Sequence, residues 1–165
     1  MPDRINAETR SRVMSAIGMK NTKIEIEIRQ GLFAHGFRFR LHVRNLPGRP
    51  DVVLPKYSTV VFINGCFWHS HNCSRATIPE TRKDWWKDKL EGNKARDAKA
   101  LVDLKRQGWR VLVVWECAIR RHGINRKAAI LHVCILMSKF LKSKKKLLEI
   151  SGQLPNGKSK RPPAK

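Results

Sequence analysis

The chain has 165 residues, which is enough for one domain with a hydrophobic core. Its 35 Lys and Arg residues outnumber 13 Asp and Glu residues, giving a net charge of +22. That charge indicates a polyanionic partner, with DNA or RNA as the leading candidate. The alternative is that this chain is a ribosome-like or merely adhesive basic protein. No apolar run approaches the roughly 18 residues of a membrane span, and the polar N-terminus lacks a signal-peptide core. We therefore expect a cytoplasmic protein, whose four cysteines are more typical of metal binding than of disulfides.

The first half of the chain is predicted to form two helices and then three strands. Val13 to Ile17 has helical spacing inside a polar N-terminal segment, residues 1–20. Thr22 and Glu25 have the form of a capping box, and Gly36 is well placed to end the helix that follows. Strands are expected at residues 37–41, 51–54 and 59–63, of which the last is continuously apolar, as in a central strand.

The second half is predicted to alternate helices with one more strand. Thr81 can cap a long helix that stops before Gly108, residues 109–115 form a strand, and residues 125–141 form an amphipathic helix. From Lys142 onward the composition predicts a basic disordered tail, residues 142–165, after a domain at residues 21–141. This order of elements predicts an α/β fold, a three-layer sandwich around a mixed central sheet.

Three cysteines and one histidine are candidate ligands of a structural zinc ion: Cys66, Cys73, Cys117 and either His69 or His71. Cys66 and Cys73 bound one polar loop that also holds both histidines. Cys117 follows a strand and can reach that loop, although a buried core cysteine is the alternative. Cys134 lies on the apolar face of the last helix and is interpreted as a core residue.

A carboxylate at the start of a strand is the candidate catalytic acid. Asp51 follows a Pro-Gly turn and can hold a hard divalent cation against a phosphate, or it can be an ordinary turn aspartate. Many nucleases place Asp/Glu-x-Lys about one strand later, but this chain has Ile63-Asn64-Gly65 there. Glu25 is explained by the capping box and gains a function only if it lies near Asp51. His69 is free to activate a water if His71 is the zinc ligand; spacing does not decide between them.

Aromatic side chains suggest a way to distort DNA. Phe67 and Trp68 flank the candidate zinc ligands and are interpreted as exposed rings that wedge into a base stack, whereas core packing is the favoured interpretation for Trp85 and Trp109. Four further residues share one face of the long helix, where contact with DNA and simple solvation have equal weight: Trp86, Lys89, Asn93 and Asp97.

One known family carries these features together. The string Asn64-Gly-Cys-Phe-Trp-His-Ser-His-Asn-Cys73 is preceded by Leu46-Pro-Gly-Arg-Pro-Asp51 and followed by Gly108-Trp-Arg-Val-Leu-Val-Val-Trp-Glu-Cys117. These motifs resemble the very short patch repair (Vsr) endonucleases, over most of the chain from about Thr9 to Arg120. The resemblance implies a restriction-endonuclease-like sandwich with a structural zinc. It also implies a Mg²⁺-dependent nick 5′ to the thymine of a T:G mismatch, formed when 5-methylcytosine is deaminated.

The resemblance also implies roles for individual residues. The zinc ligands would be Cys66, His71, Cys73 and Cys117, and Mg²⁺ would be held by Asp51 and the backbone carbonyl of Ile63. His69 would be the general base, and Glu25 would support either His69 or a metal-bound water. The residues expected at the DNA are Phe67, Trp68, Trp86, Met14, Lys89 and Asn93, with residues 1–20 as a DNA-contacting arm. Family members carry Thr-His where this chain has Ile63-Asn64, so Asn64 would donate a hydrogen bond to the phosphate in place of histidine.

Two other functions fit the same motifs. One is a nicking or restriction-type endonuclease associated with a DNA methyltransferase, and the other is a catalytically weak, zinc-stabilised module that binds mismatches. The expected substrate is double-stranded DNA with a T:G mismatch. Mismatch-repair proteins are candidate partners, and we expect a bacterial, nucleoid-associated monomer with no membrane contact.

Overall fold

The computed structural model describes residue 9 and residues 21–120, 123 and 125–152. Within this part the helices are α2 (Lys23–Ala34), α3 (Lys83–Arg106) and α4 (Arg126–Leu141), with short 3₁₀ turns at Pro55–Tyr57 and Glu116–Ala118. The strands are β1 (Val52–Leu54), β2 (Thr59–Asn64), β3 (Arg110–Trp115) and β4 (Leu147–Ile150). None of these helices is both long and apolar enough to cross a membrane. Met14 and most of the predicted N-terminal arm lie outside the described residues.

The four strands form one mixed sheet in the order β1-β2-β3-β4. β1 and β2 are antiparallel and are joined by the tight turn at Pro55–Tyr57. β2 and β3 are parallel, with Thr59 opposite Arg110, and α3 makes the crossover between them. β4 then pairs in parallel with β3. The mixed α/β architecture predicted from the order of elements is therefore confirmed for the described residues.

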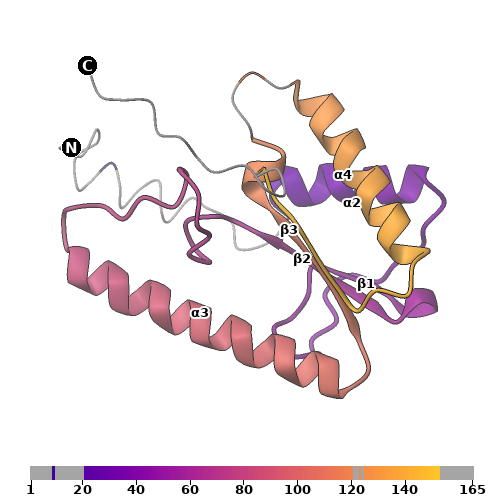
Figure 1. Cartoon of the computed structure of the whole chain (residues 1–165), viewed down its shortest axis with the longest axis horizontal. Helices are drawn as coiled ribbons and strands as arrows, with labels where there is room; N and C mark the ends of the chain where they lie inside the picture. The colour runs from indigo at the N-terminus through magenta and orange to yellow at the C-terminus, as the bar shows by residue number, and fades with distance from the viewer. Residues whose placement is uncertain (1–8, 10–20, 121–122, 124, 153–165) are drawn as a thin grey trace.

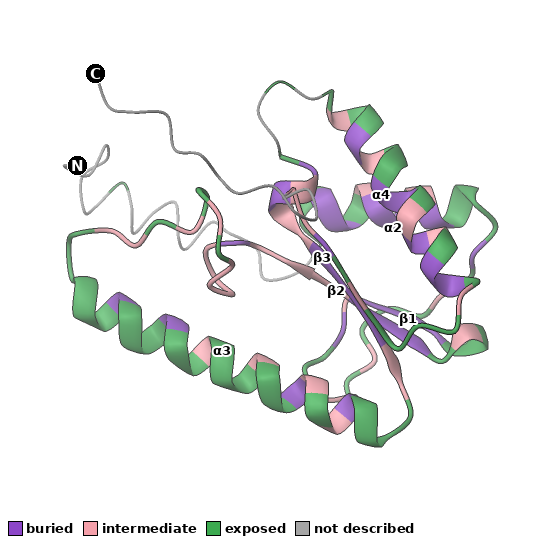
Figure 2. Ribbon diagram, in the orientation of Figure 1, coloured by how far each residue is buried: buried purple, intermediate pink, exposed green. Residues whose placement is uncertain are grey.

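Helices cover both faces of this sheet and give three layers. α2 and α4 lie on one face, and α3 lies on the other (Figure 1). The larger core lies under α2 and α4, where Ile28, Leu32 and Met137 are fully buried. The smaller core lies under the C-terminal half of α3 around Leu104 and Val111. α3 is exposed along most of its length (Figure 2), which leaves its outer surface available to a partner.

Local sequence signals explain where two helices begin. Thr22 caps α2 and its hydroxyl accepts from the Glu25 N–H, while the Glu25 carboxylate accepts from the Asn21 N–H and the Thr22 hydroxyl. The predicted cap at Thr22 is thus confirmed, whereas the return bond of Glu25 goes to the N–H of Asn21 and not to that of Thr22 itself. Asn125 caps α4 by accepting from the N–H groups of the first turn. The long helix α3 begins at Lys83 with Arg82 as its N-cap, one residue later than the predicted cap at Thr81.

The strand predicted at residues 37–41 is reduced to one bridge between Arg40 and Val53. The backbone turns away immediately afterwards, because His42 adopts a left-handed conformation with φ of 56°. Phe37 is nevertheless buried and packs edge-on against Tyr57. The alternating pattern therefore identified the buried side chain correctly but not the strand.

The predicted disordered tail, residues 142–165, was wrong at its beginning, because Leu147–Ile150 forms strand β4 of the sheet. The lysines at 142 and 144–146 dominate the local composition and hide a short strand whose Ile150 is buried in the main core. The Arg110 guanidinium fixes the turn before it by donating to the carbonyls of Ser143 and Lys145. Residues 153–165 lie outside the described residues.

Candidate active site and metal centre

Three cysteines and one histidine meet at the ends of β2 and β3. The ligand atoms of Cys66, His71, Cys73 and Cys117 all lie within 4.8 Å of one another. Cys66 follows the end of β2, and Cys117 lies in the 3₁₀ turn that follows β3. Because these two strands are parallel neighbours, their carboxyl ends place both cysteines at one edge of the sheet. The structure thus brings His71, and not His69, to the three cysteines, and this set can hold a metal ion.

Backbone hydrogen bonds fold the loop around the cluster. The His71 N–H donates to the Cys66 carbonyl at 2.9 Å, and the Cys73 N–H donates to the His71 carbonyl at 2.8 Å. The Cys117 N–H donates to the Cys66 sulfur at 3.3 Å. The His71 ring stacks on Trp115, with ring centroids 4.3 Å apart. Backbone hydrogen bonds and one aromatic contact therefore fix the shape of the loop that carries these ligands.

The environment of the cluster fits a bound cation. Burial raises the pKa of the Cys66 and Cys117 thiols, because a thiolate in this position loses its hydration. Burial also lowers the pKa of His71, which keeps the imidazole neutral and able to coordinate. A divalent cation would compensate the charge of buried thiolates, which is what a soft sulfur-rich ligand set requires. Cys134 lies apart from the cluster, buried between α4 and Gly31 of α2, as predicted.

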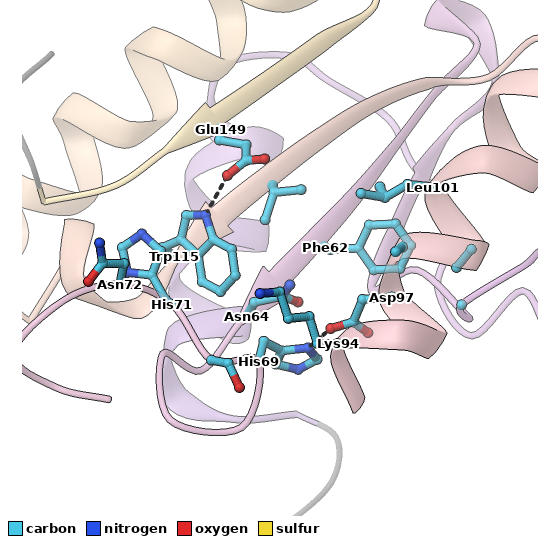
Figure 3. Close-up of a pocket in the computed structure, with 15 residues that line it drawn as sticks. Phe62, Asn64, His69, His71, Asn72, Lys94, Asp97, Leu101, Trp115 and Glu149 are labelled. Atoms are coloured by element: carbon cyan, nitrogen blue, oxygen red, sulfur yellow. Dashed lines mark hydrogen bonds and ion pairs between the residues drawn. The ribbon is translucent and has the colours of Figure 1, made fainter. Parts of the chain in front are cut away.

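His69 makes a separate pair with an acid from α3. Its Nδ1 lies 2.6 Å from Oδ2 of Asp97 (Figure 3). Because an ionised carboxylate only accepts hydrogen bonds, Nδ1 carries the proton of this bond, and the neutral tautomer of the ring then has its lone pair on Nε2. Asp97 was placed on a helix face by its spacing, but its role as the partner of His69 was missed, since the two residues are 28 positions apart. A histidine oriented by a carboxylate in this way is suited to accept a proton.

Asp51 lies at the start of β1 against the end of β2. Its Oδ2 accepts from the Ile63 N–H at 2.7 Å, which fixes the carboxylate, and its second oxygen receives no hydrogen bond from the described residues. Burial raises the pKa of Asp51 to about 6, and the charges of Glu25, Arg29 and His69 all act on it. The charges of Glu25 and His69 are therefore close enough to act on the Asp51 carboxyl.

Glu25 is held by a buried arginine. The Arg29 guanidinium donates to Glu25 Oε2 at 2.9 Å, and the side chains of this pair are only 10% and 6% exposed. The arginine offsets the negative charge that Glu25 places beside Asp51. No sequence pattern singled out Arg29, because one charged residue four positions after another is the ordinary composition of a helix surface.

The raised pKa of Asp51 predicts a cost in stability. The folded protein binds the Asp51 proton more tightly than the unfolded chain does, in which this carboxyl has a pKa near 3.8. The stabilisation that comes from the bound proton is therefore fully present below pH 3.8 and is lost as the pH rises through about 6. At pH 7.5 without divalent cations we expect Asp51→Asn to be more stable than wild type by roughly 3 kcal/mol. Urea unfolding at pH 7.5 and pH 4 measures this, and the difference should disappear at the lower pH.

The matched control is Asp88→Asn, because Asp88 is exposed on α3. This variant should unfold like wild type at both values of pH. Equal stability of Asp51→Asn and wild type at pH 7.5 would mean that the ionised Asp51 carboxylate carries no penalty from burial.

A hollow of about 300 Å³ lies between α3, the His/Cys loop and the sheet. Phe62, Leu101 and Val113 supply apolar lining, and Asn64, His69 and Asp97 line it with polar groups (Figure 3). One ordered water occupies roughly 30 Å³, so there is room beside the His69 imidazole for a reacting water and part of a substrate. Asn64 ends β2 and lines the same hollow as His69.

Aromatic rings cluster where the His/Cys loop packs on the first turns of α3. Phe67 lies 5.2 Å from Trp68 and 5.1 Å from Trp86, measured between ring centroids. Asn93 Nδ2 donates to the Trp68 carbonyl at 2.9 Å, and its own oxygen accepts from Arg96. Asn93 was predicted to contact DNA; the structure shows that it ties α3 to the loop that carries the rings.

The two tryptophans at the start of α3 differ in exposure. Trp86 is 7% exposed, because the neighbouring rings surround it, whereas Trp85 is 47% exposed and has the Arg82 guanidinium 5.1 Å from its ring centroid. The interpretation of Trp85 as a core residue was therefore wrong. Lys89 is exposed on α3.

Comparison with known proteins identifies the family. The family model described as DNA mismatch endonuclease Vsr matches residues 2–75. Type II nicking enzyme V.XorIIP of Xanthomonas oryzae is 44% identical over 123 residues, which cover 74% of this chain and 90% of the relative. Type II nicking enzyme V.NmeAIP of Neisseria meningitidis is 43% identical over 127 residues, 77% of this chain and 91% of the relative. DNA mismatch endonuclease Vsr of Escherichia coli is 43% identical over 120 residues, 73% of this chain and 77% of the relative. The chain therefore belongs to the Vsr family of DNA mismatch endonucleases and is a DNA endonuclease.

Proposed function

We propose that this endonuclease nicks one strand of double-stranded DNA on the 5′ side of the thymine of a T:G mismatch, with Mg²⁺ as catalytic cofactor and zinc as structural metal. The observation that supports this most directly is a pair of fixed polar groups: Asp51 accepts from the Ile63 N–H, and His69, which is paired with Asp97, lines the hollow. A carboxylate fixed by a backbone N–H and a histidine fixed by a second carboxylate form a pair of groups suited to phosphodiester hydrolysis.

His69 acts as the general base in this mechanism. The proton on Nδ1 stays in the hydrogen bond to Asp97, and Nε2 accepts the proton of the attacking water. Asp97 prevents the ring from turning and stabilises the imidazolium that forms. Asn64 donates its side-chain amide hydrogen bond to the scissile phosphate from the rim of the same hollow.

Asp51 and the Ile63 carbonyl would hold Mg²⁺, and the ion would neutralise charge on the scissile phosphate and lower the pKa of a bound water. The donor set fits a hard cation, because the free Asp51 oxygen and a backbone carbonyl are both oxygen ligands. Glu25 is held in place by its bonds to Arg29 and to the start of α2, so it can orient a water beside Asp51.

Zinc would be held by Cys66, His71, Cys73 and Cys117, a closed Cys₃His set. Four protein ligands leave no position for a substrate, so the proposed role of this site is to fix the loop. His69 lies two residues from His71 in that loop, and the position of the base therefore depends on the metal centre.

The DNA would lie over the aromatic cluster and the outer surface of α3. Phe67 and Trp68 are partly exposed and would wedge beside the mismatch, with Trp86 behind them and Lys89 nearby. Met14, outside the described residues, completes the proposed set of contacts. The exposed Trp85 ring, with the Arg82 guanidinium over it, extends this aromatic surface, although Trp85 had been interpreted as a core residue.

A nicking assay on three duplexes tests the proposal. The duplexes share one sequence and differ only in carrying T:G, T:A or C:G at one position, and each is incubated with and without Mg²⁺. We expect cleavage of the thymine strand of the T:G duplex alone, and only with Mg²⁺. Equal nicking of all three would favour a restriction-type activity, and tight T:G binding without product would favour a mismatch-binding module.

We expect Trp68→Ala to lose mismatch selectivity and keep its fold. Unstacking a base step costs a few kcal/mol and least at a mismatch, so a wedge discriminates by deformability as well as by contact. The ratio of single-turnover nicking rates on T:G and T:A duplexes should fall by about tenfold or more. Phe33→Ala is the matched control, because Phe33 is 57% exposed on α2 and lies on the other face of the sheet. An unchanged ratio in a folded Trp68→Ala variant would remove the wedge from the mechanism.

A further inference from the structure

The segment that follows α4 reaches the metal centre with its last described residue. The Gly152 N–H donates to the Cys117 sulfur at 3.3 Å. A Cβ at position 152 would overlap the Cys117 carbonyl oxygen and lie 3.0 Å from its carbonyl carbon, so only glycine allows this approach without a shift of the backbone. Parallel pairing of β4 with β3 carries the chain to this point, since Ile150 lies opposite Val114.

The same strand also supports the histidine of the cluster. Glu149 accepts from the Trp115 Nε1–H at 3.0 Å, and the Trp115 indole stacks on the His71 ring with an interplanar angle of 22° (Figure 3). Trp115 is thus held on one side by β4 and on the other by the candidate ligand. Two of the four ligands, Cys117 and His71, therefore receive support from residues 149–152.

We propose that β4 and Gly152 form the outer layer of the metal centre, in which Gly152 hydrogen-bonds a metal-bound thiolate and Glu149, acting through Trp115, positions His71. The inference rests on the zinc site proposed above. An N–H donor draws electron density from a thiolate and fixes its direction, while the stacked indole fixes the plane of the imidazole. Residues in this position orient ligands without touching the metal, and their loss typically costs about 10- to 100-fold in metal affinity.

Four full-length variants test the proposal. Gly152→Ala displaces the N–H from Cys117, and its matched control is Gly92→Ala on α3, where an added Cβ meets no atom within 4 Å. Glu149→Ala removes the acceptor of the Trp115 N–H, and Glu149→Gln keeps an acceptor oxygen and serves as the conservative variant. Zinc release to a chromogenic chelator is followed in each variant, and absorption spectra are recorded after substitution by Co²⁺.

We expect Gly152→Ala and Glu149→Ala to release zinc about tenfold faster than wild type or more. Their sulfur-to-cobalt charge-transfer and d–d bands should also shift, because the ligand field at the cation changes. Gly92→Ala and Glu149→Gln should match wild type in both measurements. A merely structural role of β4 would lower thermal stability without moving the cobalt bands, which separates the two explanations.

Wild-type release rates and unchanged cobalt spectra in both Gly152→Ala and Glu149→Ala would overturn the inference and leave the zinc site intact. If Gly152→Ala does not fold, the Glu149 pair decides by the same criteria. A wild-type chain that takes up neither zinc nor cobalt would contradict the proposed metal centre itself, and the inference with it.

Discussion

Asp51→Asn should bind T:G DNA as well as wild type and nick it at least about 100-fold more slowly. The substitution keeps the acceptor for the Ile63 N–H but removes the negative charge that would hold Mg²⁺ against the phosphate. Single-turnover nicking and fluorescence-anisotropy binding measure the two properties separately. Because the same variant is expected to be more stable than wild type at pH 7.5, a loss of activity would not be a loss of fold.

The control for this prediction is again Asp88→Asn, which removes an exposed acid and should reduce neither nicking nor DNA binding. Full nicking by Asp51→Asn would remove the proposed catalytic centre. Weaker DNA binding with normal single-turnover chemistry would instead make Asp51 a residue of substrate binding.

The histidine pair extends the same test. His69→Ala should be slower by about 10² to 10⁴, the usual contribution of a general base, and should keep its zinc. Asp97→Ala should be slower by a smaller factor, since the imidazole remains but is no longer oriented. His71→Ala should lose zinc. If His69→Ala lost zinc and His71→Ala kept both zinc and activity, the two histidines would exchange roles.

A site formed within one segment could be predicted from the sequence more reliably than a contact between two segments. A loop with two cysteines and two histidines indicated a metal site, but the choice of His71 depends on the hydrogen bond from its N–H to the Cys66 carbonyl. His69 and Asp97 come from a loop and a helix that meet only in the folded protein. The sequence around either residue contains no pattern that indicates the other as its partner, so this pair could not be predicted from spacing.

Adjacent residues and short strands limited the prediction in another way. Trp85 and Trp86 are consecutive on α3 and point about 100° apart, so composition alone did not tell which ring is buried. Leu147 to Ile150 is only four residues long and follows a run of lysines. Its strand conformation comes from pairing with β3 and from the Arg110 side chain, both of which are tertiary contacts.

The metal centre also carries a prediction about folding. Protein purified without added zinc should contain about one equivalent, because a Cys₃His set closes around the ion with four ligands. Cys73→Ser should lose that zinc and become insoluble or partly unfolded. Binding of structural zinc contributes on the order of 10 kcal/mol to small metal-stabilised domains, which is comparable to the whole stability of an ordinary domain.

Cys134→Ala is the matched control, since Cys134 is as buried as Cys66 but lies outside the cluster. It should keep one zinc per chain, measured by metal analysis of the purified protein, and should still nick T:G DNA. Folded, active wild-type protein without zinc would contradict the structural role of the site. Loss of zinc in both cysteine variants would mean that unfolding, and not the removal of a ligand, releases the metal. Loss in Cys73→Ser alone would assign the zinc to the cluster of Cys66, His71, Cys73 and Cys117.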